Sequence, residues 1–140
     1  MATYTKFNQY TKDLVDGVHD WDAHTIKVML TNTAPVATNS VKADLTEIAA
    51  GNGYTAGGTA SSASTSTSSG TAKVTLADVV FTAVGGSIGP FRYIVIYNDS
   101  PTSPADPLVA WYDYGSSISL NAGDSFTVDF DGSAGFYTIV

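Results

Sequence analysis

The sequence contains no cysteine, little positive charge and no long hydrophobic segment. The absence of cysteine excludes disulfide bonds and metal sites with thiolate ligands. Six Lys and Arg residues stand against thirteen Asp and Glu residues, which gives a formal net charge of −7. This balance argues against nucleic acid as a partner, because positive side chains must displace the counterions of the phosphates. No run of about eighteen apolar residues occurs, so we expect no membrane-spanning helix.

Charged residues make up 14% of the chain, whereas about 25% is usual, so much of the polar surface must consist of Ser, Thr, Asn and Gly. That composition suits β-structure with extensive protein contacts better than an independent cytoplasmic enzyme. The first residues lack the charged start, apolar core and cleavage site of a signal peptide, and we expect assembly inside a cell. At this length, we expect one domain over 1–140 with a core that needs no metal or crosslink.

Residues 1–18 are predicted to form a short helical segment that stops at Gly17. Thr3 or Thr5 is the expected N-cap, since a hydroxyl can accept a hydrogen bond from the first turn. One face of this helix carries apolar residues at helical spacing: Phe7, Tyr10 and Leu14.

The remainder of the chain predicts short strands separated by Gly, Pro and Asn turns. The Ser- and Thr-rich residues 61–70 fit either a disordered linker or an exposed strand, and we favour the strand. The other predicted strands are 25–32, 71–84 with a break near Ala77 and Asp78, 91–99, 108–115, 118–121, 125–132 and 135–140. The expected fold is therefore all-β and mainly antiparallel, a β-sandwich or jelly roll with a short N-terminal helix.

The strand within GSIGPFRYIVIYND (86–99) is apolar on both faces. Alternation places Phe91, Tyr93, Val95 and Tyr97 on one face, and Arg92, Ile94, Ile96 and Asn98 on the other. A strand at the surface of a sheet is normally polar on one face, so this second face requires a cover. Residues 108–112 show the same property.

Two covers are compatible with this pattern, namely the N-terminal helix of the same chain or another subunit. The candidate interface residues are Phe7, Tyr10, Leu14, Arg92, Ile94, Ile96, Val109 and Trp111. We expect Ile94 or Ile96 to be buried by a helix or another subunit. Arg92 is expected to pair with a carboxylate or a backbone carbonyl at the margin of that contact.

The densest group of potential metal ligands is His19, Asp20, Asp22 and His24. A metal site usually needs three or four converging protein ligands, and so short a segment supplies them only by folding tightly around the ion. We favour an exposed loop with Trp21 turned inward, and we expect neither a metal nor another cofactor.

Asp129 and Asp131 flank Phe130 and point the same way from a strand, as paired carboxylates that bind calcium or exchange protons can do. Aspartates before a glycine more often form a turn, which we favour. Neither the phosphate-loop ending nor the G-x-S-x-G elbow of serine hydrolases is present. We therefore expect no catalytic residues and no enzymatic activity. Trp111, Tyr112 and Tyr114 suit stacking on sugars or bases, but aromatic residues in strands usually belong to a core or an interface.

Three blocks resemble a group of small virion proteins of tailed bacteriophages. They are TIKVMLTNTAPVATNSVKADLTEIAAGNGYTAGG (25–58), GSIGPFRYIVIYND (86–99) and DPLVAWYDYGSSISLNAGDSFTVDFDG (106–132). The resemblance implies a non-enzymatic head-decoration (cement) protein that is assembled in the host cytoplasm and located on the head surface of the virion. Its expected partners are the major capsid protein and further copies of itself, as a homotrimer. A tail or baseplate component is the next alternative. A carbohydrate- or receptor-binding module that uses Trp21 and Trp111 is the third.

Overall fold

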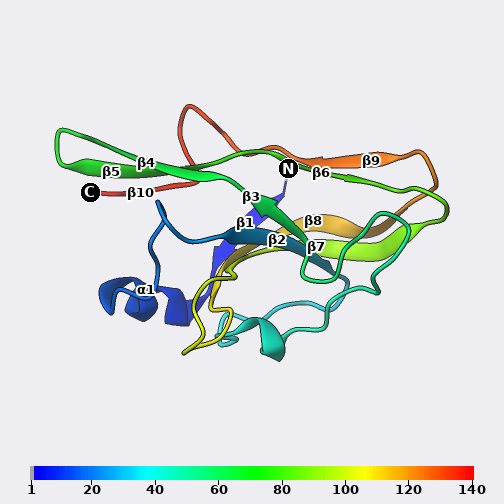
Figure 1. Ribbon diagram of the computed structural model, residues 1–140, viewed down its shortest axis with the longest axis horizontal. Helices are drawn as coiled ribbons and strands as arrows, with labels where there is room; N and C mark the ends of the chain where they lie inside the picture. The colour runs from blue at the N-terminus through cyan, green and yellow to red at the C-terminus, as the bar shows by residue number, and fades with distance from the viewer. Residues whose placement is uncertain (1) are drawn as a thin grey trace.

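The computed structural model describes residues 2–140 and consists mainly of antiparallel strands in two layers (Figure 1). One layer is a five-stranded sheet in the order β1-β8-β7-β2-β3, and the other combines a sheet β10-β5-β4 with a sheet β6-β9. The strands are β1 (Thr3–Lys6), β2 (Ile26–Thr31), β3 (Thr59–Ser61), β4 (Ala63–Ser68), β5 (Thr71–Leu76), β6 (Val79–Thr82), β7 (Ile88–Asn98), β8 (Leu108–Leu120), β9 (Ser125–Val128) and β10 (Tyr137–Ile139). The predicted all-β, sandwich-like fold is confirmed.

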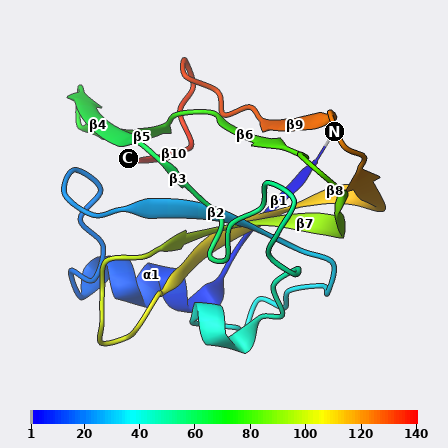
Figure 2. The same ribbon diagram turned by 45° about the vertical axis from the view of Figure 1, so that its right-hand side comes forward.

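The helical elements lie on the other side of the five-stranded sheet from the second layer (Figure 2). They are the helix α1 (Asn8–Val15) and the short 3-10 helix η1 (Lys42–Asp44). Within residues 2–140, no helix has the length and hydrophobicity needed to cross a membrane.

The N-terminal segment is only partly helical, so the prediction for residues 1–18 was wrong in its first part. β1 pairs with β8 from Thr3 opposite Asp113 to Lys6 opposite Ala110. The helix starts after Phe7, which occupies the N-cap position without a side-chain hydrogen bond, and neither predicted threonine caps it. Threonine and tyrosine favour strands, and β8 supplies a partner that local helical spacing cannot reveal.

The Ser- and Thr-rich segment is a strand, as predicted. β4 pairs with β5 along its whole length, and five of its six residues are exposed. The hairpin extends beyond the end of the five-stranded sheet (Figure 1). The predicted break falls between Leu76 and Val79, whereas the two strands predicted over 108–121 form the single strand β8.

The second face of β7 is covered by the chain itself. One core cluster fills the space between the two layers and includes Ile94, Ile96 and Val109. A second cluster lies on the opposite face of the five-stranded sheet and consists of Phe7, Met29, Val95, Tyr97, Leu108 and Trp111. Ala37 and Leu45, from the long connection after β2, pack against this second cluster. Phe7 and this connection therefore cover the face of β7 with Val95 and Tyr97, and the second β-layer covers the face with Ile94 and Ile96. Both covers belong to the same chain, and neither is the N-terminal helix alone.

The predicted alternation fails at the start of β7. Phe91 and Ile94 both belong to the core between the layers. They are three residues apart, and in a regular strand residues on one face are an even number of positions apart. The pairing with β8 shifts register between Phe91 and Tyr93, which marks a bulge or irregularity.

Candidate functional site

A cavity of about 460 Å³ lies between the five-stranded sheet and β9. Its walls are Ile94 and Tyr112 from the five-stranded sheet, residues 126–131 and Phe136 from the facing layer, and the small residues Ala2 and Gly135. A second hollow of about 320 Å³ shares Ala2, Ile94 and Phe126 with the first. β1 and β9 are both edge strands, so the sandwich has no strand to close it here.

Tyr112, Phe130 and Phe136 line this cavity, and together with the adjacent Tyr4 they form a closed set of ring contacts that we call the aromatic circuit. Tyr112 lies 5.4 Å from Tyr4 and 6.4 Å from Phe130, measured between ring centroids. Phe136 lies 6.0 Å from Tyr4 and 5.9 Å from Phe130, and the last pair is nearly perpendicular at 88°. Burial raises the pKa of Tyr112 to about 12, so its phenol stays uncharged at neutral pH. The circuit therefore offers apolar ring surface and no ionised tyrosine.

Asp129 and Asp131 are two exposed acidic residues among those that line the cavity. Asp131 Oδ1 accepts hydrogen bonds from the backbone N–H groups of Ala134 and Ser133, both at 2.8 Å, which holds the Asp131 pKa below its usual value. The predicted turn is therefore confirmed for Asp131. Lys73 lies nearby but donates to the Ser133 carbonyl at 3.0 Å. The pattern Phe126, Val128, Phe130 with intervening polar residues was the available sequence signal for this wall, and it was assigned only to a strand and a turn.

Six of the eight expected interface residues are buried inside the chain. Phe7, Tyr10, Ile94, Ile96, Val109 and Trp111 are each no more than 8% exposed, and Leu14 packs against the core between the layers. The six buried side chains therefore have almost no surface of their own for another subunit, and the contact role expected of all eight residues stays a prediction. Ile94 and Ile96 are covered by the second β-layer, which was neither of the two covers predicted for them.

Arg92 pairs with a carboxylate, as predicted. Its Nε lies 2.8 Å from Asp113 Oδ1, and its Nη2 lies 3.0 Å from Asp113 Oδ2. These two hydrogen bonds favour the charged form of both side chains, so they lower the pKa of Asp113 and raise the pKa of Arg92. Both side chains are partly exposed, so the pair adds little to stability.

The two tryptophans assigned to a carbohydrate site do not present their rings to solvent. Trp21 is 7% exposed and Trp111 is 8% exposed. Trp111 instead packs on Phe7 with a centroid distance of 4.5 Å. The more exposed rings are Tyr4 and Tyr114, at 42% and 43%.

The loop with two histidines folds inward more than expected. Trp21 is buried as predicted, but His19 is buried too, at 8% exposure. The fully buried Asn98 donates from Nδ2 to the Nδ1 atoms of His19 at 3.1 Å and His24 at 2.9 Å. Asp20 forms a turn with the N–H groups that follow it. Over the described range 2–140, no three His, Cys, Asp or Glu side chains are grouped as metal ligands would be.

We expect protonation of His19 to destabilise the fold as the pH falls. Burial lowers the His19 pKa from 6.5 to about 4, opposed by the nearby Asp13 and reinforced by His24. The unfolded chain therefore binds the proton first, and stability contributed above pH 6.5 is lost as the pH falls to about 4. Urea unfolding at pH 7 and pH 4.5 measures this loss, and His19→Asn should reduce it. Equal pH dependence in the two proteins would contradict the assignment.

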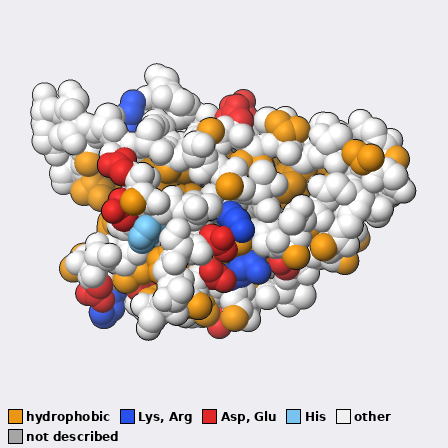
Figure 3. All heavy atoms as spheres, viewed as in Figure 1, with side chains coloured by type: hydrophobic (Ala, Val, Ile, Leu, Met, Phe, Trp, Pro, Cys, Tyr) orange, Lys and Arg blue, Asp and Glu red, His pale blue; other side chains and the backbone are white. Residues whose placement is uncertain are grey.

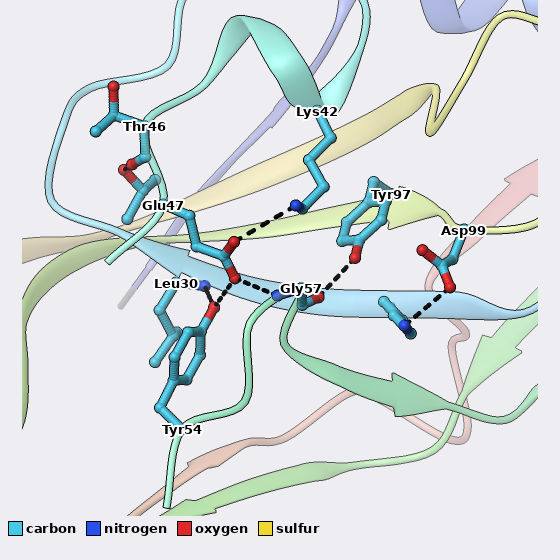
Figure 4. Close-up of polar contacts among 10 residues, drawn as sticks. Leu30, Lys42, Thr46, Glu47, Tyr54, Gly57, Tyr97 and Asp99 are labelled. Carbon is cyan, nitrogen blue, oxygen red and sulfur yellow. Dashed lines mark hydrogen bonds and ion pairs between the residues drawn. The ribbon is translucent and has the colours of Figure 1, made fainter. Parts of the chain in front are cut away.

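A polar network fastens the connection between β2 and β3 to the sheet (Figure 4). Glu47 Oε1 accepts from the Tyr54 hydroxyl at 2.7 Å and from the Gly57 N–H at 2.6 Å. The other oxygen of Glu47 lies 3.4 Å from Lys42 Nζ, and the Tyr97 hydroxyl donates to the Gly57 carbonyl at 2.6 Å. The sequence patterns gave no indication of this network, because four of its members are spread along an irregular connection and the fifth, Tyr97, lies in the distant strand β7.

The surface near this network carries balanced charge. Lys27 Nζ lies 2.8 Å from Asp99, and Lys42 and Glu47 form a second pair at 3.4 Å. Figure 3 shows positive and negative side chains side by side in the middle of this face. Opposite charges in such proximity cancel, so this face does not attract ligands of one sign.

The described geometry thus offers a cavity lined by aromatic and acidic residues, together with an exposed Ser/Thr hairpin. Comparisons with protein-family models, curated proteins and solved structures find no match to this chain.

Proposed function

We propose that the chain is a non-enzymatic structural protein of a bacteriophage virion that decorates the outside of the capsid and stabilises contacts between capsomers. The sequence resemblance supports this proposal. Its blocks supply β2, the connection that covers the five-stranded sheet, β7, β8 and β9. A tail or baseplate component remains the alternative location.

The observation that carries the proposal is the exposed edge strand β4. It has the sequence ASTSTS, without charge or proline, and it is an edge of the sheet β10-β5-β4. Soluble proteins commonly protect such edges with lysine, proline or bulges, because free backbone groups pair with other chains. The β4 edge has no such protection within its own sequence, and the hairpin holds it away from the core (Figure 1). It is therefore suited to add a strand to the major capsid protein.

Such a contact requires only modest affinity per copy. A decoration protein acts at many equivalent positions on a closed shell, so the shell is stabilised by the sum of many contacts. Serine and threonine side chains lose little conformational freedom on docking compared with lysine or glutamate. A hairpin of these residues therefore binds with a small entropic cost.

Binding to capsid shells that lack the protein tests this role. We expect the wild-type chain to add to such shells, with cryo-electron microscopy density at their outer surface. Thr67→Lys, which places a charge on β4 opposite Ala72, should weaken binding about tenfold. Ser116→Lys makes the same charge change on the exposed part of β8 and should bind normally. Density on the tail would favour the alternative, and no binding to shells or tails would refute a virion role.

The doubly apolar strands 91–97 and 108–112 also suggested another subunit as a cover, but the chain covers them by itself. We retain self-association on the shell as a proposal, because local threefold positions between capsomers favour three copies. Sedimentation of the free chain measures any intrinsic oligomer.

A further inference from the structure

We propose that the cavity beside β9 binds a compact organic cation of the quaternary ammonium class, between the aromatic circuit and the carboxylate of Asp129. The site lies apart from the β4 contact proposed above and does not depend on it. Its volume of about 460 Å³ falls within the range of about 300–1,000 Å³ for small-molecule sites.

The aromatic walls supply the first part of the argument. Tyr112, Phe130 and Phe136 all line the cavity. Phe130 and Phe136 stand almost at right angles, with centroids 5.9 Å apart, and Tyr112 lies 6.4 Å from Phe130. A cation seated against these rings comes within about 6 Å of more than one ring centroid, the distance at which cation–π attraction is appreciable.

Charge supplies the second part. Asp129 and Asp131 line the cavity, and no Lys or Arg within residues 2–140 does so. Asp131 already accepts two backbone hydrogen bonds and lies near Lys73. Asp129 is therefore the carboxylate best able to balance a bound positive charge. The overall charge of −7 also attracts a cation from solution.

The few polar groups decide the class of cation. Apart from Tyr112, the only lining residues with polar side chains are Thr127, Asp129 and Asp131. A primary ammonium must replace three hydrogen bonds to water, and a sugar must replace many more. A quaternary ammonium has no N–H group and loses least when water is removed. Its methyl groups also contact rings and the apolar wall formed by Ile94 and Val128.

The same group occurs in free choline, in phosphocholine headgroups and in trimethylated lysine. The recognised chemistry is common to all three, so the source is decided by measuring each of them. Phosphocholine adds a phosphate that the cavity carboxylates repel, whereas trimethyl-lysine adds an aliphatic stem that the apolar walls accept.

Titration of the ¹⁵N-labelled chain with choline tests the site. We expect amide shifts concentrated in residues 126–136 and around Tyr112 at millimolar choline. The control ligand is 3,3-dimethyl-1-butanol, which has the shape of choline without its charge, and we expect it to bind about tenfold more weakly. Parallel titrations with phosphocholine and Nε-trimethyl-lysine show which molecule carrying the quaternary ammonium group binds most tightly. A titration with methyl glucoside tests whether the cavity prefers a sugar instead.

Two variants measure how much the Tyr112 ring and the Asp129 charge contribute to choline binding. Tyr112→Leu keeps apolar volume but removes a ring, and should weaken choline binding about fivefold. Asp129→Asn, at an exposed position, should weaken it by a similar factor and leave the uncharged isostere unaffected. Asp16→Asn makes the same charge change at the end of α1 and should have no effect. The spectrum of each free variant shows whether it remains folded.

Equal affinity for choline and its uncharged isostere would overturn the proposal, as would tighter binding of methyl glucoside. Absence of shifts in the wild-type chain at about 50 mM choline would also overturn it, since binding that weak is not specific.

Discussion

Replacing Phe7 with alanine is expected to lower the free energy of unfolding by about 3–5 kcal/mol. Phe7 has no exposed surface, and it packs on Trp111 within the cluster on the outer face of the five-stranded sheet. Removal of the ring leaves a cavity in a cluster that also contains Met29, Val95 and Leu108, which are held by neighbouring strands and cannot collapse freely. Urea unfolding followed by tryptophan fluorescence measures the loss.

Matched variants separate the ring from other effects at the N-terminus. Phe7→Leu retains most of the volume and should cost less than about 1.5 kcal/mol. Val15→Ala removes apolar atoms from a side chain that is 82% exposed on α1, and should change stability by less than about 0.5 kcal/mol. The unfolding midpoint should also be independent of protein concentration, because a single chain forms the cluster. A Phe7→Ala cost below about 1 kcal/mol would mean that this face is covered in another way.

Replacing Gly58 with alanine is expected to cost more than about 3 kcal/mol. Gly58 precedes β3 and has a φ of +81°, a conformation that L side chains rarely adopt. An added Cβ would lie 1.9 Å from the carbonyl oxygen of Val28 and 2.8 Å from Cα of Met29. Both atoms belong to the backbone of β2, a strand bonded on both sides, so the contact is relieved only by moving the sheet.

Gly17→Ala is the control for the backbone contribution. Its φ of +74° is similar, but an added Cβ there has nothing within 4 Å. This substitution should cost about 1 kcal/mol, from the left-handed conformation alone. The difference between the two variants, measured by urea or thermal unfolding, gives the cost of the close approach. Similar losses at both glycines would show that Gly58 does not lie against β2.

Several features of the fold follow directly from local patterns. The alternation of side chains in IKVMLT predicted β2. The interruption of the apolar pattern at Ala77 and Asp78 predicted the break between β5 and β6. Abundant serine and threonine with scarce charge predicted an exposed strand at residues 61–70, where β4 lies. These features depend on side-chain period and turn chemistry within a few residues, which a single sequence contains.

The candidate site could not be read in the same way. Asp131 was recognised as a turn residue, but the cavity joins it to Ile94 and Tyr112 from strands far away in the chain. The bulge that moves Phe91 into the core is likewise a property of pairing with β8. The sequence also indicated that β7 needs a cover on each face, and left open which segment or subunit provides it.

The structure decides that question through contacts between distant segments. Phe7 lies against Trp111, while Ala37 and Leu45 close the same cluster from the connection after β2. Local periodicity shows that a side chain is apolar and which way it alternates, because both follow from backbone geometry. It does not show what the side chain meets, because that depends on which distant segments gain most free energy by packing together.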